Sequence, residues 1–124
     1  MKKPNRKLLV KKADKAFGDY IKARDPYCVV CGTTENPQCG HLFTRMYYST
    51  RWNENNAFKQ CCGCNLRHEY DAYPFTKYFL DRFGVAGYDE LHRTAKSIHK
   101  ISNGGLELII ETYKRKLETL NHNQ

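Results

Sequence analysis

Two Cys-x-x-Cys pairs, about thirty residues apart, constrain this sequence more than any other feature. The pairs are Cys28 with Cys31 and Cys61 with Cys64. The short loop inside each pair lets both thiolates reach one ion, and Zn²⁺ prefers four such ligands arranged as a tetrahedron. The spacing therefore predicts a structural zinc site that holds two distant parts of the chain together.

A structural zinc would also compensate for a thin hydrophobic core. Glycine, polar and charged residues dominate positions 32–72, and bound zinc contributes folding free energy where apolar burial is small. Two further cysteines, Cys39 and Cys62, fall outside the pairs. We expect them to be spare, semi-buried thiols rather than ligands.

The charge balance favours a nucleic-acid partner. The chain has 21 Lys and Arg against 13 Asp and Glu, which gives a formal net charge of +8 at pH 7. An excess of positive charge is what the neutralisation of phosphates requires. The length of 124 residues suits one domain, residues 1–124.

The cysteines are expected to bind metal in a reducing cytoplasm rather than to form disulfides. The basic segment 1–7 is followed by only Leu8, Leu9 and Val10 before charge returns, so we expect no signal peptide. No apolar run approaches the length of a membrane span.

Helical periodicity precedes the cysteine-rich centre. A first helix is expected over residues 7–25, because apolar residues recur at helical spacing. It should end there because the residue before Pro26 is disfavoured in a helix. Residues 27–72 are predicted to form turns and short strands around the metal, with a helix that starts near Cys64 and runs through Glu69.

Three helices are expected after the centre, over residues 74–84, 88–98 and 106–120. Pro74 suits a first turn, Gly84 suits a helix end, and the last segment is amphipathic. The sequence thus predicts an α+β fold in which helices flank a small zinc-stapled centre.

His41 and Asn65 are the candidates for chemistry. Phosphodiester cleavage needs a base that activates water and a divalent cation that neutralises charge on the phosphate. Zinc would bring these two residues together, because Asn65 directly follows the second cysteine pair. His41 is expected to be a neutral base with a pKa near the reference value of about 6.5. Asn65 would be a metal ligand, with a helix cap as the alternative. Asn56 completes this set as a residue that organises the loop near the histidine.

These residues follow the order His, Asn, Cys-x-x-Cys-Asn, and in this the sequence resembles the ββα-metal, or HNH, nucleases. The stretches 40–41, 51–56 and 59–65 are similar to the NinG (Rap) recombination endonucleases of lambdoid phages. The resemblance covers about residues 8–120. It implies a ββα-metal (HNH, His-Me finger) core and a metal-dependent DNA endonuclease that acts on branched recombination intermediates, such as Holliday junctions and flaps. Longer family members carry an N-terminal segment that this chain is expected to lack.

The resemblance also implies roles for single residues. His41 would be the general base, and Asn65, with His68 or Glu69, would hold a catalytic Mg²⁺ or Mn²⁺ ion. His68 and Glu69 lie on the same helix face as Asn65, and simple solvent exposure is the alternative for both. Many HNH enzymes have an Asp, Glu or His ligand directly before the base, whereas this sequence has Gly40.

Arg45 and Arg51 flank the loop after His41, and we expect them to contact DNA phosphates, with a solvated basic face as the alternative. Two other functions stay open: a sequence-dependent nicking or homing-type HNH endonuclease, and a non-enzymatic zinc module that binds nucleic acid or protein. The former usually needs a separate DNA-reading domain. The latter has no need of both His41 and Asn65. Whether a homodimer acts on a junction is also open.

Overall fold

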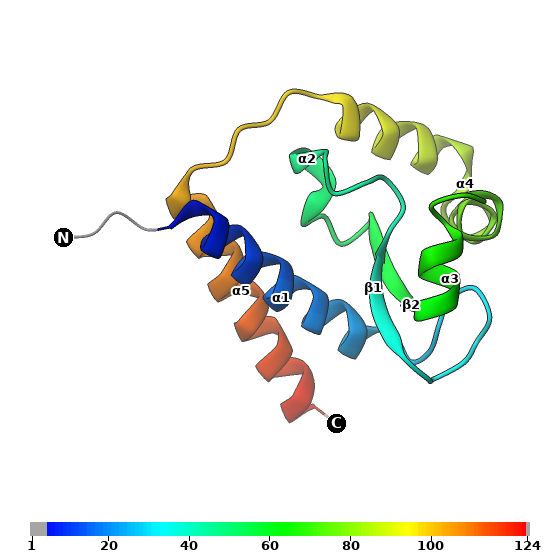
Figure 1. The fold of residues 1–124 in the computed structure, drawn as a ribbon, viewed down its shortest axis with the longest axis horizontal. Helices are drawn as coiled ribbons and strands as arrows, with labels where there is room; N and C mark the ends of the chain where they lie inside the picture. The colour runs from blue at the N-terminus through cyan, green and yellow to red at the C-terminus, as the bar shows by residue number, and fades with distance from the viewer. Residues whose placement is uncertain (1–4, 124) are drawn as a thin grey trace.

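The computed structural model describes residues 5–123 of the expected single domain, and residues 1–4 and 124 lie outside the described residues. The chain is mostly helical with one small sheet (Figure 1), which confirms the α+β class. In chain order the elements are α1 (Arg6–Arg24), β1 (Pro37–His41), α2 (Tyr48–Arg51), β2 (Ala57–Cys61), α3 (Cys62–Arg67), α4 (Tyr73–Lys96) and α5 (Asn103–His122).

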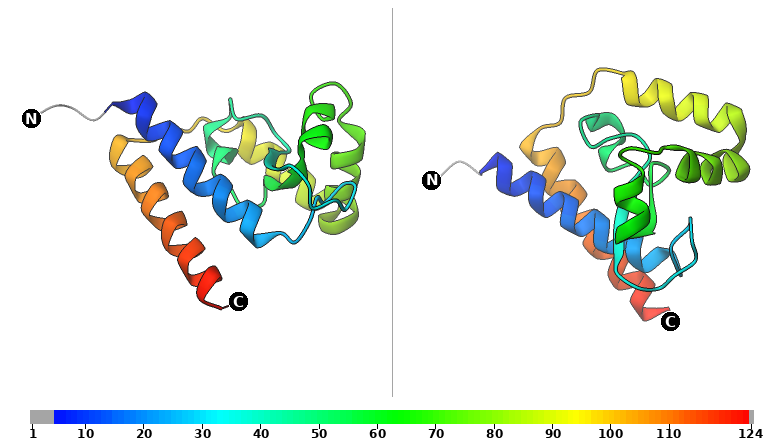
Figure 2. Two further views of the ribbon diagram at one scale, coloured as in Figure 1. Left: turned by 60° about the horizontal axis from the view of Figure 1, so that its bottom comes forward. Right: turned by 45° about the vertical axis from the view of Figure 1, so that its right-hand side comes forward.

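The first and last helices pack side by side, as the views in Figures 1 and 2 agree. Asn5 caps the start of α1, because its side chain accepts a hydrogen bond from the Leu8 N–H, and the helix ends before Pro26 as expected. α5 begins three residues earlier than expected, because the Ser102 hydroxyl caps it. Phe17 and Tyr113 meet edge to face at 4.9 Å between ring centroids in the core between the two helices.

The two strands are antiparallel and lead directly into a short helix. Gly40 pairs with Phe58 and Gln38 pairs with Gln60 across the sheet. α3 follows β2 without a loop and starts at residue 62, two residues earlier than expected, because the Cys61 sulfur accepts from the Cys64 N–H and caps it. The expectation that this helix includes Glu69 was wrong, since α3 ends at Arg67.

Helix α4 consists of two helical segments that meet at Gly84, where φ is 75° and ψ is 172°. The break was expected at this glycine, because a positive φ favours a residue without a side chain. The second segment ends at Lys96, two residues earlier than expected. The first segment buries Phe75 and Phe79 against Phe58 of β2 in a second core cluster.

Within residues 5–123, no helix combines the length and the apolar character needed to cross a membrane.

Candidate functional site

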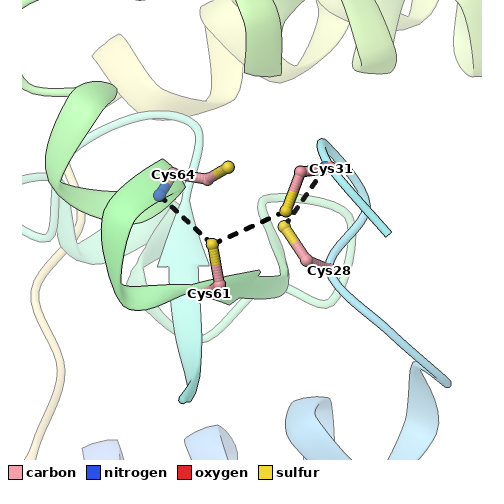
Figure 3. A group of neighbouring side chains, drawn as sticks. All are labelled: Cys28, Cys31, Cys61 and Cys64. Atoms are coloured by element: carbon pink, nitrogen blue, oxygen red, sulfur yellow. Dashed lines mark hydrogen bonds between the residues drawn. The ribbon is translucent and has the colours of Figure 1, made fainter. Parts of the chain in front are cut away.

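The four paired cysteines form a compact cluster between the end of α1 and the start of α3 (Figure 3). Their sulfur atoms all lie within 4.8 Å of one another. The Sγ atoms of Cys31 and Cys61 are 3.7 Å apart. A tetrahedron with Zn–S bonds of about 2.3 Å has an edge of about 3.8 Å. The predicted four-cysteine site therefore has dimensions that can hold a zinc ion.

Backbone N–H groups prepare the first cysteine of each pair for metal. The Cys31 N–H lies 3.5 Å from the Cys28 sulfur, and the Cys64 N–H lies 3.4 Å from the Cys61 sulfur. Burial raises the pKa of the Cys28 thiol, but the hydrogen bonds that it accepts outweigh burial and lower this pKa to about 7. A thiolate is thus accessible at neutral pH, as zinc binding requires.

The two remaining cysteines do not belong to the cluster. Cys39 lies against Gly18 of α1, and burial raises the pKa of its thiol to about 12. Cys62 is exposed. Neither joins the metal cluster, as expected for spare thiols, but the expectation that both are semi-buried was wrong for Cys62.

Beside the cysteine cluster lies an open cavity of about 1210 Å³. Its walls come from α1, β1 with the following loop, the last residue of α2, α3 with the turn after it, and the second segment of α4. Six of the predicted site residues line it: His41, Arg45, Arg51, Asn65, His68 and Glu69. The cavity is also lined by three lysines, Lys15, Lys22 and Lys96, and by three carboxylates, those of Asp14, Asp19 and Glu69. The structure therefore brings residues from distant parts of the sequence around one cation-rich hollow.

The imidazole of His41 is held in one tautomer. Its Nε2 atom lies 2.9 Å from the Arg51 carbonyl oxygen. Because a carbonyl oxygen only accepts, Nε2 carries the proton and Nδ1 keeps a free lone pair. Burial lowers the pKa of His41 to about 4, so the expectation of a value near 6.5 was wrong. The imidazole is neutral at pH 7 in either case.

Asn56 organises the loop that follows His41 and does not line the cavity. Its side chain is fully buried, accepts from the Phe43 N–H at 2.8 Å and donates to the carbonyls of Phe43 and Thr50. These bonds fix the chain between β1 and β2. They fit the loop-organising role that the sequence suggested.

Asn65 presents its oxygen toward the end of β1. Its Nδ2 group donates to Gln38 Oε1 at 2.8 Å, which fixes the orientation of the amide. The Oδ1 atom then lies 3.1 Å from the point where a Cβ atom of residue 40 would stand. The alternative role as a helix cap was wrong, since Cys61 caps α3.

His68 and Glu69, the residues expected to share a cation with Asn65, line the same cavity but differ in environment. The Nε2 atom of His68 donates to the Leu42 carbonyl at 3.0 Å, and its Nδ1 atom is buried without a partner among the described residues. Glu69 is exposed. Across residues 5–123, the four cysteines are the one group of three or more His, Cys, Asp or Glu whose donor atoms converge. A catalytic Mg²⁺ or Mn²⁺ ion therefore gains no support from a second cluster of this kind.

The two predicted phosphate-binding arginines differ in environment. Arg45 is open to solvent, with 58% of its side chain exposed. The Arg51 side chain is only 16% exposed and donates two hydrogen bonds to the Asp14 carboxylate of α1, from Nε at 3.0 Å and from Nη2 at 2.6 Å. The short contacts to Asp14 give Arg51 a structural role. Arg45 also pairs with Asp14, at 3.5 Å between Nη1 and Oδ2, but its exposed side chain can still reach phosphate.

Sequence reasoning missed Asp14. Its carboxylate binds Arg51 and also accepts from the Trp52 indole N–H at 3.0 Å, so it ties α1 to α2. Asp14 adjoins the buried Ala13 on the inner side of α1. An acidic residue at the edge of an apolar helix face was the available signal.

Comparison with known proteins places the chain in a family. The family described as Bacteriophage Lambda NinG protein matches residues 1–123. Protein ninG of Salmonella phage P22 is 30% identical over 120 residues, which are 93% of this chain and 59% of that protein. Protein ninG of Escherichia phage lambda is 28% identical over 124 residues, covering 96% of this chain and 60% of that protein.

The chain thus spans about three fifths of the length of these curated relatives. No solved structure matches it. The match over nearly the whole chain shows that the protein belongs to the bacteriophage lambda NinG family.

Proposed function

We propose that this protein is a metal-dependent DNA endonuclease that cuts branched recombination intermediates, such as Holliday junctions and flaps. One observation carries the proposal. The free Nδ1 of His41 and the oriented oxygen of Asn65 belong to residues that line one cation-rich cavity, next to a site that can hold structural zinc. The order of two antiparallel strands followed directly by a helix supports an HNH-type core around them.

In this proposal His41 is the general base. Water loses a proton to Nδ1, its oxygen bonds to phosphorus, and the bond from phosphorus to the leaving oxygen breaks. The leaving oxygen takes a proton from solvent. The Arg51 carbonyl keeps Nδ1 unprotonated by holding the Nε2 proton. Asn65 Oδ1 would hold a Mg²⁺ or Mn²⁺ ion, which supplies positive charge to the phosphate when bound.

In this proposal the exposed basic residues of the cavity bind DNA. Arg45 and the cavity lysines, on α1 and on the second segment of α4, lie where they can neutralise phosphates on both sides of His41. Such an enzyme would act on DNA in the cytoplasm of the infected cell. A sequence-dependent HNH endonuclease and a non-enzymatic zinc module are the alternatives.

A single-turnover assay tests the proposal. Zinc-loaded protein is mixed with a four-way junction, a flap and a linear duplex of the same sequence, with Mg²⁺, with Mn²⁺ or with EDTA. We expect cleavage of the branched substrates that requires the divalent cation. His41→Ala should lower the rate by about 10²–10⁴-fold while DNA binding and zinc content stay unchanged. His99→Ala, at an exposed histidine outside the cavity, is the matched control.

The other outcomes of this assay favour one of the two alternative functions or refute the role of His41. Equal cleavage of the linear duplex at defined sequences would favour the sequence-dependent enzyme. DNA binding without cleavage under any of these conditions would favour the zinc module. Equal cleavage by wild type and His41→Ala would refute His41 as the base.

A further inference from the structure

Residue 40, directly before His41, has no room for a side chain. A Cβ atom built on Gly40 would overlap the Nε2 atom of Gln60 and lie 2.9 Å from its Cδ atom. The obstacle is therefore the end of one side chain from the neighbouring strand. The resemblance to HNH enzymes implies an Asp, Glu or His ligand at residue 40, and the end of the Gln60 side chain fills the space where that side chain would begin.

Gln60 is unusual because it is polar, completely buried and unpaired. Its side chain is 0% exposed, and neither Nε2 nor Oε1 has a hydrogen-bond partner within the described part of the chain. Burying an amide without partners is unfavourable, so such a side chain is expected to have a ligand. Its two ends are also interchangeable by a half-turn about the last bond, so either can face Gly40.

The Asn65 oxygen points to the same place. Asn65 Oδ1 lies 3.1 Å from the Cβ position of residue 40, while its Nδ2 group donates to Gln38. The carboxamides of Gln60 and Asn65 thus approach one point at the end of β1, one residue before His41. Asn65 lines the cavity whereas Gln60 does not, and their two amide oxygens form a donor set that suits a hard divalent cation.

We propose that Gln60 is a ligand of the catalytic cation, together with Asn65, in place of the side chain that Gly40 lacks. This inference rests on the proposed function, since it supplies the ligands for its cation. Either end of the Gln60 amide can face this point, and a Mg²⁺ ion held there would lie about 2.1 Å from each ligand oxygen. Two neutral ligands bind weakly, and phosphate oxygens of DNA complete the shell.

Direct binding of Mn²⁺ to the full, zinc-loaded chain without DNA tests this assignment. Electron paramagnetic resonance of free Mn²⁺ gives the dissociation constant. Gln60→Glu adds a carboxylate and should tighten binding by about tenfold or more. Gln60→Met keeps the volume, removes the oxygen and should weaken binding by about tenfold. Asn55→Asp adds the same charge at an exposed residue of the loop before β2 and should leave the constant unchanged.

Unchanged Mn²⁺ affinity in folded Gln60→Met, or the absence of binding in both wild type and folded Gln60→Glu, would overturn the inference. Zinc content and circular dichroism establish folding, and Gln60→Met keeps the test decisive if the buried glutamate does not fold. The DNA assay separates the two proposals. If cleavage depends on His41 but the Mn²⁺ affinity is the same in wild type and the Gln60 variants, only this inference is refuted. Mn²⁺ binding that follows residue 60 without any cleavage would refute only the nuclease.

Discussion

Replacing Asp14 by alanine is expected to destabilise the protein and to loosen His41, although the two residues do not touch through a hydrogen bond. The Asp14 carboxylate accepts from Arg51 Nε and Nη2 and from the Trp52 indole N–H, at 3.0, 2.6 and 3.0 Å. Arg51 in turn offers the carbonyl that accepts from His41 Nε2. The carboxylate is therefore the point at which α1 holds the backbone beside the histidine.

The expected loss of stability follows from the environment of the pair. Breaking a fully buried ion pair costs about 3–5 kcal/mol, because one charge stays buried alone. Here the side chains of Asp14 and Arg51 are 20% and 16% exposed, so water compensates part of that loss. We expect a decrease of about 2–4 kcal/mol in the free energy of unfolding, and a decrease of about 10 °C in Tm.

Asp19→Ala is the matched control on the same helix. Asp19 pairs with Lys15 at 2.8 Å and Lys22 at 3.6 Å on the solvent side, and exposed pairs of this kind contribute at most about 1 kcal/mol. Urea unfolding at saturating zinc gives both values. Nitrogen NMR of the imidazole should show that His41 loses its preference for the Nε2–H tautomer in Asp14→Ala alone. Equal destabilisation by the two variants, with an unchanged His41 tautomer, would refute the reasoning.

Four further predictions follow from the site. Cys61→Ser should lose the single zinc per chain and the cooperative fold, and a well-folded preparation without zinc would contradict the metal centre. Arg45→Ala should reduce the salt dependence of DNA affinity by about one counterion, as measured by titration at several salt concentrations, whereas an unchanged slope would exclude a phosphate contact. The pKa of His41 is lowered to about 4, so between pH 4 and about 6.5 the unfolded chain binds one proton that the folded chain does not. The free energy of unfolding should therefore rise with pH across this window, at most by about 1.4 kcal/mol per pH unit, and His41→Phe should flatten that slope. Gly40→Ala should destabilise the protein by about 1–3 kcal/mol because it displaces Gln60, and a double-mutant cycle with Gln60→Ala should relieve most of this cost; additive losses would show that Gln60 is not the obstacle.

Features that are encoded by a short motif or a single residue were predictable, even where zinc would join two motifs about thirty residues apart. The cysteine spacing predicted the four-sulfur cluster, because each pair needs only a short turn to reach one ion. Gly84 predicted the break in α4, since its backbone adopts a positive φ. Asn56 was recognised as a loop organiser, and its bonds reach back only to the loop that precedes it. In these cases local chemistry determines the result.

Features that depend on packing between distant segments were not predictable. Asp14 and Arg51 are 37 residues apart, and periodicity says only that Asp14 borders the apolar face of α1. The low pKa of His41 arises from burial, which the sequence around it does not reveal. Gln60 is buried like Phe58 and alternates with the half-buried Lys59 and Cys61, but nothing in its sequence context shows that its amide fills the space of a side chain at residue 40.

Two separate restraints therefore position the candidate site. The cysteine cluster fixes the start of α3 and hence Asn65, because Cys64 and Asn65 are adjacent. It does not reach His41, whose ring lies 6.0 Å from that of Phe17 on α1 and whose tautomer depends on the carbonyl that Asp14 helps to hold. Loss of zinc should first release Asn65, whereas loss of the Asp14 network should first release His41. The N-terminal helix is thus part of the site and not only a flank of the zinc-bound centre.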